Sequence, residues 1–134
     1  MVLRLRVRIC FRSKCAEGLG IANSGFVGEV PEVVIPESMA KELLPEGYSL
    51  TLVSKVLANG TQTYLPRTVD TLDLYLITED RIEGPIKVYA YVVKCNFILL
   101  NDSTLSTLKI AIIDPKEGLW CFRNELSKRI RRGY

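Results

Sequence analysis

The chain has 134 residues, of which 48% are apolar and 25% charged, and its formal net charge is +3. This composition is typical of one folded domain over residues 1–134, and it excludes a disordered chain. The sequence has no histidine, which excludes a Ser/His/Asp triad, a Cys/His pair and HExxH zinc chemistry within one chain. It also lacks the GxxxxGK[ST] and GxGxxG motifs of nucleotide sites.

No segment of the sequence indicates membrane insertion or secretion. No stretch approaches the ~20 apolar residues that span a bilayer, and arginine at every second position interrupts the apolar N-terminus, unlike a signal peptide. We therefore expect a cytoplasmic protein without membrane contact, metal or cofactor. The sequence has four cysteines and no CxxC pair: Cys10, Cys15, Cys95 and Cys121. In such a protein we expect them to be reduced and mostly buried. The alternative is a disulfide of the kind found in the cytosol of thermophiles.

The first third of the chain predicts strands, one loop and one helix. Residues 2–12 alternate apolar side chains with mostly arginine, the pattern of a strand with one buried face. Residues 13–20 predict a turn into a second strand, and residues 21–29, IANSGFVGE, predict a tight loop of small residues. Residues 33–35 predict a buried strand, after which a proline begins a short helix over 36–44.

The remainder of the chain predicts mainly strands joined by turns. Asn59 and Gly60, between two extended runs, are typical of a β-hairpin turn. A second short helix is predicted over residues 103–108, with Asp102 or Ser103 as its N-cap. Strands are predicted over 49–57, 69–78, 86–94, 97–100, 110–113 and 119–122, with a polar turn over 79–85.

Together these elements predict an all-β fold with one or two short helices, arranged as a barrel or a sandwich. Its core is expected to cover about residues 2–122. The basic C-terminal segment, residues 123–134, is expected to be helical or frayed. Basic residues also crowd the first strand, so that the two ends of the chain carry Arg4, Arg6, Arg8 and Arg12, and Lys128, Arg129, Arg131 and Arg132.

Four acidic side chains lie close together in the sequence around the predicted turn. A calcium or magnesium site would use such carboxylates, but a solvated surface is the more common role of a charge run. We therefore expect a solvated surface and no metal from Asp70, Asp73, Glu79 and Asp80.

Several short motifs follow one another in a recognisable order. A small-residue loop with the triplet NSG is followed by a strand and helix, VVIPESMAKELL, then by an Asn-Gly hairpin, by the run FILLN with a short helix, and by a final hairpin. Over roughly residues 3–122 this order resembles the retropepsin-type, single-lobe aspartic peptidases of the retroviral-like clan (clan AA). The residues that carry the resemblance are Asn23, Ser24, Gly25, Phe26, Gly28, Glu29, Ile35, Pro36, Ala40, Leu43, Asn59, Gly60, Leu99, Leu100, Ile113, Asp114, Gly118 and Leu119.

The resemblance implies a single-lobe, acid-protease-like closed barrel that assembles as a homodimer with its cleft between the two copies. In this family the triplet begins with aspartate. Two such carboxylates, one from each copy, share a proton and activate a water molecule that attacks the peptide bond. The resemblance thus assigns the catalytic position to Asn23 with Ser24 and Gly25, and substrate binding to Phe26, Asn59 and Gly60.

Asn23 is a departure from the family pattern that removes its chemistry. An amide neither accepts a proton near neutral pH nor donates one as a carboxylic acid does, so the chain as written is expected to be catalytically inactive. A second departure is Asn101, where the family has glycine. Asparagine tolerates the left-handed backbone angles of a glycine turn, so the turn is expected to survive.

Three functions remain open from the sequence. The first is an inactive aspartic-peptidase-like domain, as a homodimer, that binds an extended peptide by strand addition. The second is an active aspartic endopeptidase whose natural residue 23 is aspartate. The third is a nucleic-acid or protein adaptor that uses the basic termini. Outside its context the triplet itself is an ordinary turn sequence.

Overall fold

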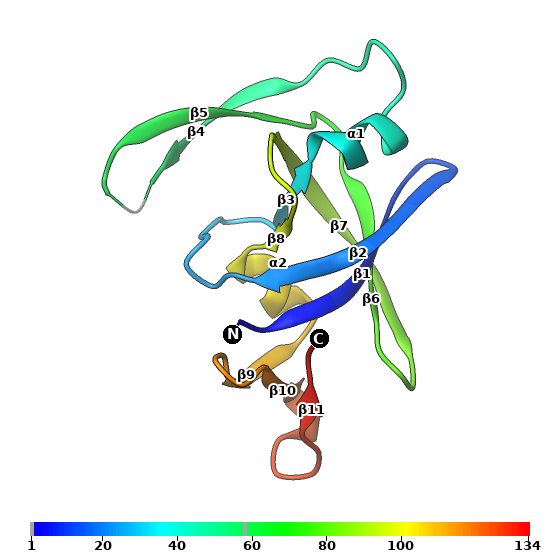
Figure 1. Ribbon diagram of the computed structural model, residues 1–134, viewed down its shortest axis with the longest axis vertical. Helices are drawn as coiled ribbons and strands as arrows, with labels where there is room; N and C mark the ends of the chain where they lie inside the picture. The colour runs from blue at the N-terminus through cyan, green and yellow to red at the C-terminus, as the bar shows by residue number, and fades with distance from the viewer. Residues whose placement is uncertain (1, 58) are drawn as a thin grey trace.

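The computed structural model describes residues 2–57 and 59–134, and within them the chain is mainly β-structure with two short α-helices (Figure 1). The helices are α1 (Glu37–Leu43) and α2 (Asp102–Thr107), with a 3₁₀ turn η1 (Arg123–Glu125). The strands are β1 (Arg4–Phe11), β2 (Lys14–Ala22), β3 (Glu32–Pro36), β4 (Thr51–Val56), β5 (Gln62–Arg67), β6 (Leu72–Ile77), β7 (Ile82–Val93), β8 (Ile98–Leu100), β9 (Ile110–Asp114), β10 (Leu119–Phe122) and β11 (Arg131–Arg132).

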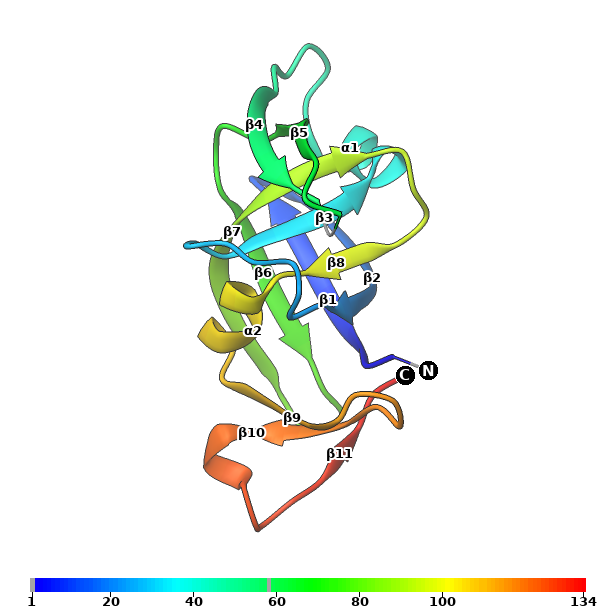
Figure 2. The same ribbon diagram turned by 90° about the vertical axis from the view of Figure 1, so that its left-hand side faces the viewer.

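Six of the strands close into a barrel. They pair in the order β3-β8-β2-β1-β6-β7, and β3 pairs with β7 to complete the ring. The β4–β5 hairpin continues the sheet from β7 and projects beyond the barrel, while β9, β10 and β11 form a separate small sheet at the opposite end (Figure 2). The predicted closed β-barrel with one or two short helices is therefore confirmed.

The alternating pattern of the first strand builds the barrel interior. Leu5, Val7 and Ile9 of β1 are buried, and the arginines between them lie half-exposed on the outer face. The neighbouring strand β6 repeats the pattern through three buried leucines. Because side chains alternate across a strand, a run with period two gives one wall of the core. The cluster of buried apolar side chains extends from Leu3 to Phe122.

The expectation that all cysteines are reduced is wrong for one pair. Cys10 and Cys15 are directly opposite each other in the β1–β2 hairpin, with their Cα atoms 4.0 Å apart, and they form a disulfide. The short hairpin brings the two side chains together, which a count of cysteines does not reveal. Cys95 is a half-buried free thiol and Cys121 a buried one.

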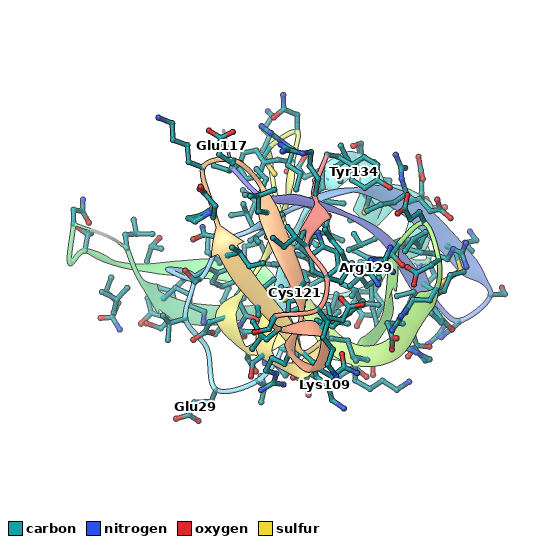
Figure 3. All side chains as sticks on the ribbon, turned by 90° about the horizontal axis from the view of Figure 1, so that it is seen from below. Glu29, Lys109, Glu117, Cys121, Arg129 and Tyr134 are labelled. Atoms are coloured by element: carbon teal, nitrogen blue, oxygen red, sulfur yellow. A yellow bond between two sulfur atoms is a disulfide. The ribbon has the colours of Figure 1, made fainter. Side chains whose placement is uncertain are left out.

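The C-terminal segment has only one short 3₁₀ turn, η1, at its start, and the rest is neither helical nor frayed, which corrects the expectation from its basic composition. After η1 the chain runs past Arg129 to Tyr134 (Figure 3) and forms β11 on the way. Arg131 of β11 pairs with Trp120 of β10. The buried guanidinium of Arg131 forms ion pairs with Asp80 at 2.7 Å and Glu125 at 2.8 Å. It also lies 5.0 Å from the ring centroid of Phe122, so charge and aromatic contacts hold the segment.

The four acidic residues of the predicted solvated surface all have polar partners in the fold. Asp70 accepts a hydrogen bond from Tyr48 at 2.9 Å, and Asp73 pairs with the lysine of the adjacent strand. Glu79 and Asp80 both bind Arg129 at 3.2 Å. The predicted turn over 79–85 is shorter than expected, because β7 already begins at Ile82.

The ion pair of Glu125 and Arg131 predicts an acid-sensitive fold. Hydrogen bonding to Arg131 lowers the pKa of Glu125 to about 2, from 4.5 in the unfolded chain. Because the fold favours the ionised carboxylate, the ion pair gives its full stabilisation above pH 4.5. This stabilisation is lost as the pH falls toward 2 and the carboxylate is protonated. Glu125→Gln should therefore reduce, by about 1–2 kcal/mol, the loss of unfolding free energy between pH 6 and pH 3 measured by urea denaturation.

Glu46→Gln is the matched control, because Glu46 is exposed shortly after α1, and α1 lies at the end of the barrel opposite β9, β10 and β11 (Figure 1). It should leave the parent's pH dependence unchanged. If the parent and Glu125→Gln lose the same unfolding free energy between pH 6 and pH 3, this ion pair does not contribute to acid stability.

Candidate functional site

The loop that carries the NSG triplet joins β2 to β3 and lies against the start of α2 (Figure 2). The backbone N–H of Asn23 donates to the carbonyl of Leu100 at 3.0 Å, at the end of β8. Farther along, the N–H of Asp102 donates to the carbonyl of Phe26 at 3.0 Å, and Asp102 Oδ1 accepts from the N–H of Gly28 at 3.1 Å. The triplet and the FILLN run, distant in sequence, are thus neighbours in the fold.

The triplet itself forms a turn that faces solvent. Asn23 Oδ1 accepts a hydrogen bond from the backbone N–H of Gly25 at 3.1 Å, the usual side-chain contact of an Asx turn. Ser24 and Gly25 are exposed. A carboxylate oxygen could accept the same bond from Gly25, so the geometry of this turn accommodates aspartate as well as asparagine.

A groove of about 590 Å³ separates this loop from the β4–β5 hairpin. Its walls are mostly apolar, and Val56 at its rim is 71% exposed. Of the residues that the sequence assigned to the site, Gly25 and Phe26 line the groove, whereas Asn23, Ser24, Asn59 and Gly60 do not. The lining residues are Gly25, Phe26, Val27, Val34, Ser54, Lys55, Val56, Leu57, Leu65 and Leu99.

No aspartate or glutamate is among the described residues that line the groove. Its polar groups are the hydroxyl of Ser54, the ammonium of Lys55 and backbone atoms. One chain therefore offers apolar contacts and hydrogen bonds to a ligand, but it offers no carboxylate for acid–base chemistry.

The Asn-Gly hairpin turn is present where the sequence predicted it. Gly60 has a positive φ of +83°, which explains the glycine, and Asn59 Oδ1 accepts from the N–H of Thr61 at 2.9 Å. Residue 58, inside this turn, lies outside the described residues. The turn is at the far end of the hairpin from the barrel, so Asn59 and Gly60 stand at its tip (Figure 1).

Glu32 is the central charged residue of the site, and sequence reasoning did not identify it. It is only 3% exposed, at the start of β3. Its carboxylate accepts hydrogen bonds from Lys55 Nζ, Arg67 Nη1 and the hydroxyl of Tyr91, each at 2.8 Å. These three partners come from β4, β5 and β7. One buried carboxylate therefore attaches both strands of the hairpin to the barrel.

Two partners of Glu32, Lys55 and Tyr91, have raised pKa values and keep their protonated forms at neutral pH. Burial lowers the pKa of Lys55, but the hydrogen bond and charge of Glu32 outweigh it and raise the pKa overall. Burial, and then the hydrogen bond to Glu32, raise the pKa of Tyr91. Lys55 Nζ also lies 5.5 Å from the ring centroid of Phe26 and donates to the carbonyl of Val27 at 3.3 Å. Lys55 therefore joins the hairpin to the loop as well.

Asn101 supports the loop in a way that the sequence did not predict. It is fully buried, and its backbone is extended, with φ −79° and ψ 174°, so the left-handed conformation expected of a glycine position is not used. Its Oδ1 accepts from the backbone N–H of Glu32 at 3.0 Å and of Thr104 at 2.8 Å. Asn101 is therefore the N-cap of α2, and the predicted cap at Asp102 or Ser103 is wrong.

Gly28 completes the packing between these two side chains. A Cβ at this position would lie 2.6 Å from Glu32 Oε1 and 2.8 Å from Asn101 Nδ2. Both atoms are held by part-buried hydrogen bonds and cannot move aside without breaking them. The glycine is thus required by close approach, a reason visible only in the tertiary structure.

Comparison with protein-family models and with curated protein sequences finds no match for this chain. Among residues 2–57 and 59–134, no group of three or more cysteine, aspartate or glutamate side chains is arranged to hold a metal ion. In the same residues no helix has both the length and the apolar character needed to cross a membrane.

Replacing the buried carboxylate tests its role as the anchor of the hairpin. Glu32→Gln should destabilise the fold by about 1.5–3 kcal/mol, because it removes the charged acceptor of the hydrogen bonds from half-buried Lys55 and Arg67. Glu29→Gln is the control, because Glu29 is exposed in the loop before β3. It should change the free energy of unfolding by less than about 0.5 kcal/mol. Similar urea-denaturation midpoints for both variants would contradict this assignment.

The same measurement tests Asn101. Asn101→Gly, which restores the residue of the resembled family, should destabilise the fold by about 1–3 kcal/mol, since it removes a helix cap and a buried amide with several hydrogen bonds. Asn96→Gly is the control, because Asn96 is exposed in the loop before β8. An Asn101→Gly variant as stable as the parent would show that the turn needs only a permissive backbone.

Proposed function

We propose that this chain is a catalytically inactive aspartic-peptidase-like domain whose groove binds an extended, apolar peptide. The observation that carries the proposal is the apolar groove between the NSG loop and the β4–β5 hairpin, with an amide in place of the family's carboxylate. The order of elements around a closed barrel is consistent with the resemblance. Recognition without hydrolysis is what these groups can perform chemically.

The outer edge of the hairpin supports binding of a peptide strand. β4 stands at the end of the sheet order, paired on one side only, with β5, within the described residues. Its free edge presents backbone N–H and C=O groups that an added strand would use. Ser54, Lys55 and Val56 of this strand also line the groove, so that a peptide paired with β4 would place side chains in it.

The proposal includes a homodimer, because the resembled family builds its cleft from two copies. In such a dimer both catalytic positions would carry Asn23. Neither copy could then supply the acid or the base, which together contribute far more than the ~10²–10⁴-fold effect of one such group.

An active endopeptidase with aspartate at position 23 is the second candidate. One contact favours it: Asn23 Oδ1 accepts a hydrogen bond from the backbone N–H of Gly25. An aspartate at position 23 would accept the same bond. The adaptor function has less support. Arg129 and Arg131 at the basic C-terminus are already paired with Glu79, Asp80 and Glu125, which reduces the charge available to nucleic acid.

Peptide cleavage at acid pH, measured on this chain and on Asn23→Asp, distinguishes the candidates. With a library of fluorogenic octapeptides, the chain itself should show no cleavage above background. Asn23→Asp should cleave below about pH 6, where a pair of close carboxylates holds one proton. Cleavage by the chain as it stands would overturn the assignment of the site.

Binding of the same library, read by fluorescence polarisation, tests recognition separately. Val56→Asp, in the groove, should weaken binding about tenfold, since it replaces an apolar contact with a charge. Val69→Asp is the control, because Val69 is also exposed but lies outside the groove. If neither protein cleaves and Val56→Asp binds peptides as well as the parent, the groove is not a peptide site.

A further inference from the structure

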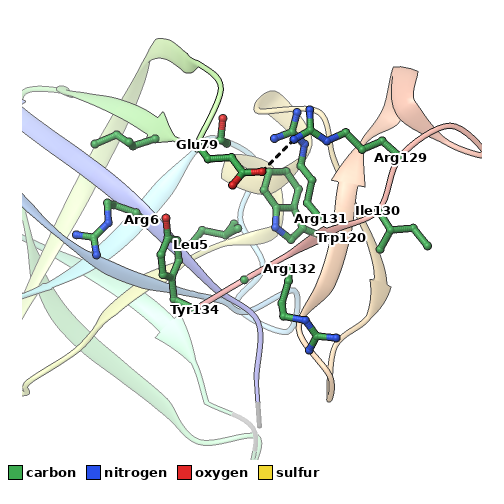
Figure 4. Close-up of a pocket in the computed structure, with 12 residues that line it drawn as sticks. Leu5, Arg6, Glu79, Trp120, Arg129, Ile130, Arg131, Arg132 and Tyr134 are labelled. Carbon is green, nitrogen blue, oxygen red and sulfur yellow. Dashed lines mark hydrogen bonds and ion pairs between the residues drawn. The ribbon is translucent and has the colours of Figure 1, made fainter.

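A second cavity lies at the opposite end of the barrel, between the barrel and the C-terminal segment (Figure 4). Its volume is about 270 Å³, enough for a small molecule but not for a peptide chain. The elements around it are β1, β6, β10 and β11. Its lining residues are Leu5, Arg6, Ile77, Thr78, Glu79, Trp120, Arg129, Ile130, Arg131, Arg132, Gly133 and Tyr134.

The indole of Trp120 gives this cavity an unused hydrogen-bond donor. Trp120 is 3% exposed, and its Nε1 has no hydrogen-bond partner among the described residues. Figure 4 shows the ring in the middle of the site, between Arg131 and Leu5, with its nitrogen toward the space that Leu5 and Tyr134 border. Buried N–H groups are nearly always paired, so this donor calls for an acceptor, which a water molecule or a ligand oxygen in the cavity can supply.

The charges around the cavity favour an anionic acceptor. Four arginines line it. Arg129 and Arg131 have carboxylate partners in Glu79, Asp80 and Glu125. Arg6 and Arg132 have none among the described residues: Arg6 lies 5.1 Å from the ring centroid of Tyr134, and Arg132 donates to the carbonyl of Glu117 at 3.3 Å.

We propose that this cavity is a binding site for a small oxyanion, a carboxylate or a phosphate, whose oxygen accepts a hydrogen bond from Trp120 Nε1. Arg6 and Arg132 supply the compensating positive charge, and Leu5 with Ile77 contacts any short apolar group that the anion carries. The site is separate from the peptide groove, and it does not depend on the function proposed for that groove.

The single tryptophan makes the test direct. In a ¹H–¹⁵N correlation spectrum it gives one indole N–H signal, which belongs to Trp120. Titration of the full chain with sodium acetate, sodium benzoate or inorganic phosphate, at constant ionic strength in chloride, should move this signal in a saturable manner. A response to the carboxylates alone, or to phosphate alone, identifies the class of anion, and sodium chloride should have no effect.

Charge-neutralising variants test whether the arginines of the cavity are responsible. The double variant Arg6→Gln/Arg132→Gln should weaken anion binding at least roughly fivefold, the upper effect of one exposed ion pair. Lys14→Gln/Lys41→Gln removes the same charge near the β1–β2 turn and α1, at the other end of the molecule (Figure 1), and should leave affinity within about twofold. If the double variant fails to fold, Arg132→Gln alone is used.

Two results would overturn the proposal. One is an indole signal that none of the three anions moves in a saturable manner, which would mean that Trp120 bonds only to water. The other is equal weakening by the cavity variant and the distant lysine variant, which would mean that the anion responds to net charge and not to this site.

Discussion

The arrangement of the candidate site depends on the buried carboxylate of Glu32. A charge out of water is stable only when it is paired and its lone pairs are filled, and here Lys55, Arg67 and Tyr91 satisfy this requirement together. The backbone of the same residue is bound as well, because its N–H donates to Asn101 Oδ1. The hairpin, the end of the loop and the start of α2 are thus positioned against one residue of β3.

This constraint supports the recognition function that we propose for the groove. The hairpin is held at a defined distance from the loop, which leaves an apolar channel beside the free edge of β4. The ammonium of Lys55 is occupied by Glu32 and the carbonyl of Val27, so it is not a free catalytic group. With Asn23 in the turn, the site retains shape and hydrogen-bonding edges but lacks the carboxylate that hydrolysis in the resembled family requires.

Arg131 has the corresponding role at the other end of the barrel. It is a buried cation between Asp80 and Glu125, and its guanidinium lies over the rings of Trp120 and Phe122. It holds the C-terminal segment across the barrel end and so forms one wall of the second cavity (Figure 4). Each end of the molecule therefore combines a buried ion pair with a concave surface. The groove beside Glu32 is mostly apolar, and the cavity beside Arg131 is rich in arginine.

The sequence by itself determined the local elements, because strand alternation, proline and Asn-Gly turns act over a few residues: β1, α1 and the β4–β5 hairpin are where the pattern predicted them. Only the tertiary structure decided which distant residues meet. Asn101 and Glu32 are 69 residues apart, and nothing local in either marks their contact. Even the Cys10–Cys15 disulfide required the register of a hairpin. Buried charges and caps depend on neighbours that the closure of the barrel supplies, which is why the roles of Glu32, Asn101 and Arg131 could not be predicted from their residue types.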